Sequence, residues 1–169
     1  MDRTPTDNPV VRLPQRHDCR PRLDSYVYGP SGYVTHVAIG SHRKRPVLTT
    51  NPQVAGLICA CLEAAAFAQG GRLYCYCLMP DHLHFLVAID PGGSNVATIV
   101  RSFGIRVTMR TKHLCAPPLF QRSFYDSVVR EDDDLPERCT YVVNNPVRQE
   151  LVADWRDYPY TWLSPELGS

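Results

Sequence analysis

The chain has 169 residues, a formal net charge of +1, 44% hydrophobic residues and 21% charged residues. These values are ordinary for a soluble globular protein, and the length fits a single domain with a substantial core. The apolar runs are too short to span a membrane, and the polar N-terminus does not resemble a secretory signal. We therefore expect one cytoplasmic domain.

Cysteine usage gives little support to a disulfide framework. The chain has 7 cysteines with no Cys-x-x-Cys pair, although Cys59/Cys61 and Cys75/Cys77 form Cys-x-Cys pairs. These pairs could form a thiolate metal site, but in a reducing compartment buried cysteines usually act as small hydrophobic residues. We favour that second interpretation.

The first part of the chain divides into an arm and a strand. Residues 1–25 are rich in Pro, Arg and Asp without periodicity, which indicates a flexible basic arm. The run Tyr33–Ile39 is typical of a β-strand, and a basic loop follows at Gly40–Arg45. We expect the folded domain to span residues 26–163, with a short tail at 164–169.

A helix and a β-hairpin are predicted next. Asn51 and Pro52 are favoured residues for a helix cap and a first helical position, and apolar residues then recur at helical spacing up to Gly70. Residues 72–88 contain two strand-like runs joined by a turn at Met79–Asp81, where Pro and Asp favour a tight turn.

The second half of the chain predicts two more helices and a strand. Ser94 or Asn95 can cap a helix whose continuity Gly104 puts in question, and Phe124–Val129 is strand-like. Asp134, with Glu137 three residues later, predicts a helix that runs to about Asn145, before Pro146. The aromatic C-terminal tail should pack against the body. This order predicts an α+β fold with an antiparallel four- to five-stranded sheet and helices on one face.

His82 and His84 are the first candidates for chemistry. In a strand, side chains two residues apart share a face, so both imidazoles point the same way while Leu83 and Phe85 point the other way. Two imidazoles on one face can supply two ligands to a metal ion. The alternative is a pair of ordinary surface or hydrogen-bonded histidines.

Tyr141 and Asn145 are the second pair of candidates. On a helix they would lie one turn apart on the same side. A tyrosine oxygen can attack phosphorus, and an asparagine carbonyl oxygen can complete a metal site. Taken alone, however, the tyrosine could belong to the core and the asparagine could end the helix.

Basic residues are unevenly distributed. Residues 101–122 contain no acidic residue, and Arg43–Arg45 form another basic group. Local basic surface attracts phosphate even on a nearly neutral protein, although solvated helix faces explain such groups equally well. The candidates for DNA binding are Arg101, Arg106, Arg110, Lys112, Arg122, Arg43 and Lys44.

Three motifs in order carry a resemblance that covers nearly the whole chain. They are Met79–Val87, Phe120–Asp126 and Tyr141–Arg148. Together they resemble the single-tyrosine HUH transposases of bacterial insertion sequences, and most closely the REP-associated tyrosine transposase branch. The resemblance implies a ferredoxin-like or RRM-like HUH nuclease fold.

The resemblance also implies roles for individual residues. His82 and His84 would bind Mg²⁺ or Mn²⁺, Asn145 would be a third ligand, and Tyr141 would be the nucleophile. The substrate would be single-stranded DNA with hairpins formed by repeat palindromes, cleaved through a 5′-phosphotyrosine link and rejoined without ATP. A nucleoid-associated protein, acting as a monomer or a homodimer, would fit this activity.

Three positions depart from the pattern of the resembling transposases. Leu119 replaces a common tryptophan, His36 interrupts a strand that is usually rich in Thr and aromatic residues, and Asp81 replaces the commoner asparagine. His36 is also a candidate general base.

Two other functions are compatible with the residues. The chain could be a catalytically silent protein that binds repetitive palindromes, or a metal-dependent hydrolase in which water is the nucleophile. Substitution of Tyr141 distinguishes these alternatives.

Overall fold

One antiparallel sheet is the centre of the fold. The computed structural model describes residues 33–129 and 134–167, so the predicted arm at residues 1–25 lies outside the described residues. The sheet has the strand order β4-β1-β3-β2-β5, which confirms the predicted class. The strands are β1 (Val34–Gly40), β2 (Gly71–Leu78), β3 (His82–Ile89), β4 (Tyr125–Val128) and β5 (Thr161–Leu163).

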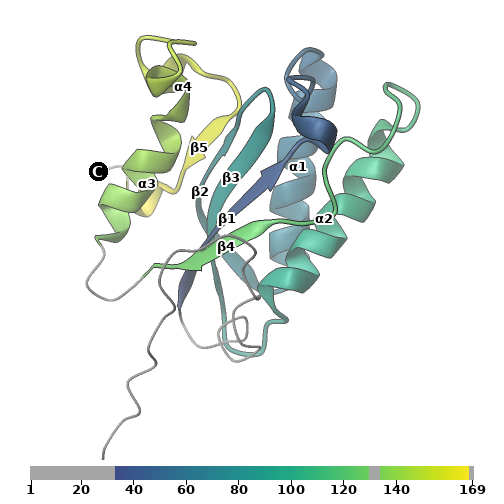
Figure 1. Ribbon diagram of the computed structural model, residues 1–169. Coiled ribbons are helices and arrows are strands. Elements are labelled where there is room, and N and C mark those ends of the chain that lie inside the picture. Colours follow the sequence, from purple (N-terminus) through teal and green to yellow (C-terminus); the bar gives the residue numbers. More distant parts are fainter. Residues whose placement is uncertain (1–32, 130–133, 168–169) are drawn as a thin grey trace, which may run out of the picture.

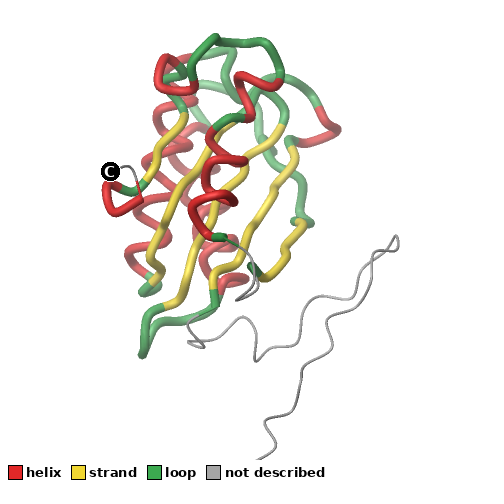
Figure 2. The backbone as a smooth tube through the Cα atoms, turned by 90° about the vertical axis from the view of Figure 1, so that its left-hand side faces the viewer, coloured by secondary structure: helices red, strands yellow, loops and turns green. Residues whose placement is uncertain are grey.

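Helices cover both faces of this sheet. The long helices α1 (Pro52–Ala68) and α2 (Val96–Thr111) lie on one face, as predicted, and α3 (Leu135–Val143) lies on the other (Figure 1). The view from that second side shows a helix running in front of the strands (Figure 2). The second face needs this cover because it carries apolar side chains, which pack with Cys139 and Val142 of α3.

The shorter elements complete the described chain. They are η1 (His42–Lys44), α4 (Asn145–Arg148), η2 (Trp155–Asp157) and η3 (Pro165–Leu167). Within the described residues, none of the helices is long and apolar enough to span a membrane.

The predicted helix starts agree with the observed caps. The Asn51 side chain accepts hydrogen bonds from the backbone N–H groups of Gln53 and Val54, at 2.9 and 3.4 Å. Asn95 caps α2 through the Thr98 N–H at 2.8 Å, and Asp134 caps α3 through the Glu137 N–H at 3.4 Å. Gly104 does not interrupt α2, since the helix is continuous from Val96 to Thr111.

The β2–β3 hairpin separates the two faces as the alternation of residues predicted. Leu83, Phe85 and Val87 are buried in the larger core under α1 and α2. The register pairs His84 with Ala38 and His82 with Gly40 on β1, and directly paired residues share a face. Both histidines therefore lie on the side of the sheet that α3 covers.

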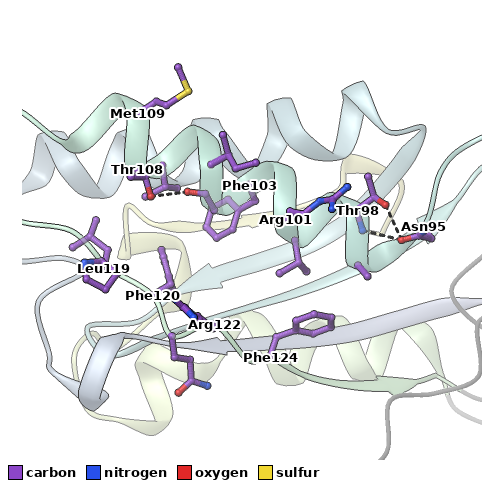
Figure 3. A pocket seen from close by; sticks show the side chains of 17 residues that line it. Asn95, Thr98, Arg101, Phe103, Thr108, Met109, Leu119, Phe120, Arg122 and Phe124 are labelled. Atoms are coloured by element: carbon purple, nitrogen blue, oxygen red, sulfur yellow. Dashed lines mark hydrogen bonds between the residues drawn. The ribbon is translucent and has the colours of Figure 1, made fainter.

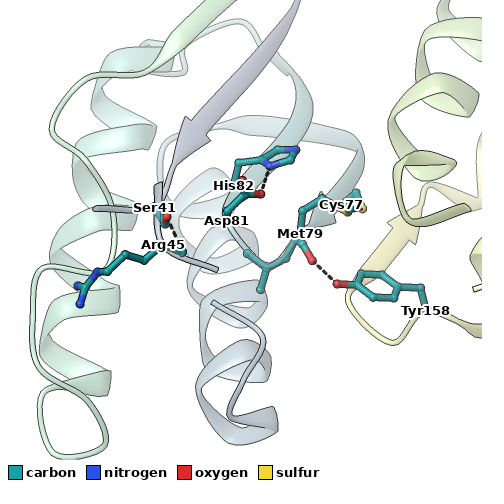
Figure 4. A network of polar contacts seen from close by, with 8 residues as sticks. Ser41, Arg45, Cys77, Met79, Asp81, His82 and Tyr158 are labelled. Carbon is teal, nitrogen blue, oxygen red and sulfur yellow. Dashed lines mark hydrogen bonds and ion pairs between the residues drawn. The ribbon is translucent and has the colours of Figure 1, made fainter. Parts of the chain in front are cut away.

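The aromatic tail holds the end of β2 next to the hairpin turn, which confirms that it packs on the body. The Tyr158 hydroxyl donates a hydrogen bond to the Leu78 carbonyl at 3.0 Å (Figure 4), and the Leu78 N–H donates to the Tyr160 carbonyl at 2.9 Å. Because Leu78 ends β2, these bonds fix the strand end from which the Met79–Asp81 turn leads to His82.

Phe85→Ala should destabilise the protein strongly, because Phe85 of β3 is fully buried in the core that the sheet forms with the long helices α1 and α2. A buried Phe→Ala change costs about 3–5 kcal/mol, a large share of the stability of a small domain. Urea unfolding followed by circular dichroism measures it. The matched control is Phe67→Ala, since Phe67 is 87% exposed; equal losses in the two variants would contradict the described core.

Candidate functional site

The two predicted ligand histidines lie side by side on β3. Their ring centroids are 4.6 Å apart, and the ring planes are nearly perpendicular, at 84°. Neighbouring imidazoles on one strand can donate nitrogen lone pairs to a common ion. The structure thus brings His82 and His84 together in an arrangement that permits metal binding.

Each histidine has a hydrogen-bond partner on its Nδ1 atom. His82 Nδ1 lies 2.5 Å from Asp81 Oδ1 (Figure 4), and His84 Nδ1 lies 3.1 Å from Nε2 of His36 on β1. The side chains of His36 and His84 also have their ring centroids 5.2 Å apart. The site therefore contains a third imidazole, that of His36, which contacts His84.

Burial favours the neutral form of two of the three imidazoles, those of His36 and His84. Desolvation, with a smaller contribution from the charge of Arg138, lowers the pKa of His36 to about 4. Desolvation also lowers the pKa of His84 to about 3, and the neighbouring His82, His36 and Arg148 add to this effect while Asp81 opposes it. At neutral pH both rings are thus neutral and keep a nitrogen lone pair.

Tyr141 lies on α3, on the same side of the sheet as the histidines. Its neighbours Cys139, Val142 and Val143 are buried against the sheet, whereas Tyr141 itself is 48% exposed. The guanidinium carbon of Arg148 lies 4.4 Å from the centroid of the Tyr141 ring. Because the charge of Arg148 also acts on His84, this arginine connects the tyrosine with the histidine cluster.

Asn145 is fixed one helical turn after Tyr141, as predicted. It is 8% exposed, and its Nδ2 donates hydrogen bonds to the carbonyls of Tyr141 and Val142, at 3.2 and 2.9 Å. Pro146 has no N–H for the Val142 carbonyl, so the asparagine amide takes its place where α3 ends. With Nδ2 engaged, Oδ1 is the atom of Asn145 that could bind a metal ion.

In the part of the chain that the structure describes, a metal site built only from His, Cys, Asp and Glu side chains is not found. Within residues 33–129 and 134–167, no cluster of three or more such side chains is placed to hold an ion. Two imidazoles and one asparagine oxygen give a mixed nitrogen and oxygen donor set, which suits Mn²⁺ and tolerates Mg²⁺ with bound waters. The donor chemistry of His82, His84 and Asn145 therefore fits the expected ion.

The basic residues of 101–122 that were predicted to bind DNA lie in different surroundings in the structure. Arg101 and Arg122 line a groove of about 790 Å³ between α2 and residues 118–124, together with Phe103 and Phe124 (Figure 3). Arg106 and Arg110 lie instead beside Cys61 of α1, where their charges oppose the rise in the pKa of the thiol that burial causes. Lys112 follows the last residue of α2.

Arg43 and Lys44 lie near the histidine hairpin. The Ser41 N–H donates to the Asp81 carbonyl at 2.7 Å, and the Leu48 N–H donates to the Pro80 carbonyl at 2.9 Å. These bonds tie the loop that carries both basic residues to the turn before His82. Arg43 and Lys44 have φ values of 59° and 53°, a conformation that is uncommon for residues other than glycine and is found often at functional sites.

The sequence did not predict that His36 and Arg148 contact the proposed metal ligands and nucleophile. His36 was considered only as a general base, and its contact with His84 depends on the β1–β3 register, which the sequence does not show. Arg148 was noted only as part of a motif. Its contact with Tyr141 depends on how α4 follows α3 after Asn144, which the predicted end of the helix before Pro146 did not show.

Comparison with known proteins supports the resemblance to transposases. No family model matches the chain. A Haemophilus influenzae protein classed among the REP-associated tyrosine transposases is 26% identical over a match 96 residues long, and the match covers 50% of this chain and 54% of the relative. The chain thus matches about half the length of that curated relative.

Solved structures share the fold. A REP-associated tyrosine transposase bound to a REP hairpin superposes with a TM-score of 0.66 at 17% identity, covering 86% of this chain and 82% of that one. A Deinococcus radiodurans protein described as a transposase superposes with a TM-score of 0.50 at 21% identity, covering 78% of this chain and 95% of that one. The sequence match and the shared fold together confirm the resemblance that the motifs indicated.

Proposed function

We propose that this chain is a REP-associated type of tyrosine transposase that cleaves and rejoins single-stranded DNA at hairpins of repeat palindromes. The observation that carries the proposal is the position of α3, which presents Tyr141 on the same sheet face as His82 and His84. The relative classed among these transposases and the fold neighbour bound to a REP hairpin support the same function.

Tyr141 is the proposed nucleophile. Its phenolic oxygen attacks the scissile phosphorus in line, the bond from phosphorus to the 3′ oxygen breaks, and the phenol loses its proton. The products are a 5′-phosphotyrosine link and a free 3′-OH. A second 3′-OH can attack the phosphotyrosine and restore a phosphodiester, so strand transfer needs neither water nor ATP.

His82, His84 and Asn145 are the proposed ligands of Mg²⁺ or Mn²⁺. When bound, the ion supplies positive charge that polarises the scissile phosphate and favours departure of the 3′ oxygen. The protein prepares for this by keeping His84 neutral through burial and by fixing Asn145 through its amide.

Arg148 is proposed to stabilise negative charge during the attack. Its guanidinium lies over the Tyr141 ring at 4.4 Å, and its charge reaches His84. A planar cation at this place can hydrogen-bond a phosphate oxygen. It would therefore hold the scissile phosphate between nucleophile and metal ligands.

DNA would meet the protein at two described surfaces. Arg43 and Lys44 would bind phosphates close to the histidine hairpin. In the groove, Arg101 and Arg122 would bind phosphates while bases stack on aromatic rings such as Phe124. Arg106, Arg110 and Lys112 would add longer-range attraction along α2.

Hairpin affinity should fall steeply with salt. If Arg43, Lys44, Arg101 and Arg122 each neutralise one phosphate, raising the salt from about 50 to about 200 mM should weaken binding roughly 50-fold for single-stranded contacts. Fluorescence anisotropy with a labelled hairpin oligonucleotide measures this. The double variant Arg101→Ala/Arg122→Ala should flatten the salt slope, whereas Arg72→Ala should not, because Arg72 pairs with Asp90 at the other end of the hairpin. A flat response of the unmodified protein would contradict these contacts.

The proposed function is tested by covalent capture. The protein is incubated with Mn²⁺ or Mg²⁺ and a single-stranded hairpin oligonucleotide from the flanks of its own gene, and the products are separated on a denaturing protein gel. We expect a metal-dependent band of protein joined to DNA. Tight binding without that band would favour the catalytically silent DNA-binding protein, and cleavage with a free 5′-phosphate would favour a hydrolase.

A single chain suffices for this proposal. Tyr141 and both histidines lie on one side of one sheet, so a monomer already contains the nucleophile and the ligands. A homodimer that exchanges α3 between subunits is the alternative, and light scattering of the protein with bound hairpin distinguishes the two states.

A further inference from the structure

We propose that Asp81 and His36 are positioning residues that hold His82 and His84 so that both present Nε2 to one metal ion. The inference rests on the proposed function, because it concerns the same metal site. It adds two residues whose side chains are not expected to touch the ion.

The observation is that both Nδ1 atoms are already engaged. His82 Nδ1 lies 2.5 Å from the carboxylate of Asp81, and His84 Nδ1 lies 3.1 Å from His36 Nε2. An imidazole has only two ring nitrogens. Nε2 is therefore the nitrogen that each histidine keeps available, and the two rings lie 4.6 Å apart between centroids.

The direction of the hydrogen bonds follows from the chemistry of a ligand histidine. A neutral imidazole that binds metal through Nε2 carries its proton on Nδ1 and donates it to an acceptor, which fixes the ring and increases the basicity of Nε2. Asp81 accepts from His82. His36 must then accept through Nε2 and carry its own proton on Nδ1.

The sheet register explains how His36 reaches His84. Ala38 lies directly opposite His84, and His36 is two residues away on the same face of β1. Diagonal neighbours in an antiparallel pair are within reach of aromatic side chains, and the small Ala38 leaves space between them. Asp81 and His36 are also two of the positions at which this chain departs from the transposases that it resembles.

This arrangement argues against His36 as the general base. Its Nε2 is engaged with His84 and is therefore not available to accept the proton of Tyr141. Its contribution is therefore exerted through His84.

Binding of Mn²⁺ to the full chain without DNA tests the inference, with free Mn²⁺ measured by electron paramagnetic resonance. His36→Leu removes the acceptor and should weaken binding about 10- to 100-fold. His36→Gln keeps an acceptor oxygen and should remain much closer to the unmodified protein. The control His113→Leu makes the same chemical change at an exposed residue after α2 and should have no effect. Asp81→Ala and Asp81→Asn form the corresponding pair for His82.

The outcomes separate the inference from the proposed function. If His82→Ala weakens Mn²⁺ binding and His36→Leu binds the ion like the unmodified protein, the positioning role of His36 is overturned and the metal site stands. If the unmodified protein does not bind Mn²⁺, the metal site and this inference both fail. Long-range ¹H–¹⁵N spectra of the unmodified protein give a readout that does not depend on folding of variants: we expect Nδ1–H tautomers for His36, His82 and His84, and an Nε2–H tautomer at His84 would overturn the inference.

Discussion

Tyr141→Phe is expected to abolish the covalent protein–DNA band and to leave hairpin affinity unchanged. The substitution removes only the phenolic oxygen, and its aromatic ring can stay beside Arg148 at the observed separation of 4.4 Å. Loss of a nucleophile typically lowers turnover by about 10³-fold or more, whereas binding through phosphate contacts is not affected. Because Tyr141 is 48% exposed, we also expect little change in stability.

The measurement combines the denaturing gel with anisotropy on the same protein samples. Tyr33→Phe is the matched control, since Tyr33 is 38% exposed and precedes β1 at the end of that strand away from the Gly40–His82 pair. Its covalent band should equal that of the unmodified protein. A band that persists in Tyr141→Phe would assign the nucleophile to another residue. Cleavage that continues without any band would replace the transposase mechanism with hydrolysis by water.

Local sequence rules predicted the elements that carry this chemistry. The i, i+2 spacing placed His82 and His84 on one face because strand geometry alone decides it, and the caps at Asn51, Asn95 and Asp134 marked three helix starts. The spacing of Tyr141 and Asn145 similarly follows from helix geometry. Each of these predictions depends on residues that are close together in the sequence.

Contacts that depend on the tertiary arrangement of the elements could not be predicted from the sequence. The contact between His36 and His84 requires the β1–β3 register, which hydrophobic alternation does not specify when several strands could pair. The position of α3 on the second face depends on which strands expose apolar residues there. In the same way, charge counting grouped five basic residues of α2 and the following segment, but only Arg101 and Arg122 among them line the groove.

The structure also changes the relative weight of the DNA-binding candidates. Arg43 and Lys44 belong to a short loop, and backbone hydrogen bonds join that loop to the Pro80–Asp81 turn. A residue far from the histidines in sequence thus becomes a neighbour of the site. The third motif acquires an added function in the same way, because Arg148 lies over Tyr141.

His82→Ala is expected to lower metal-dependent cleavage about 10²- to 10⁴-fold at low Mn²⁺ and to be partly rescued by higher Mn²⁺. One imidazole and Asn145 would remain as ligands, so the ion binds more weakly but its place is preserved. Tyr141→Phe, in contrast, should not respond to added metal, because its defect is the missing nucleophile. Cleavage measured across a series of Mn²⁺ concentrations separates the two kinds of defect.

His82 is a better choice for this test than His84. The His82 side chain is 23% exposed and pairs with Asp81, which is itself 45% exposed, so water can replace the lost contact. Removing His84 would leave the mostly buried His36 without its partner and cost about 1–3 kcal/mol of stability, which confuses loss of metal with partial unfolding. If His82→Ala cleaves like the unmodified protein at every Mn²⁺ concentration, His82 is not a ligand, and the proposed metal site must be abandoned even if the covalent tyrosine mechanism holds.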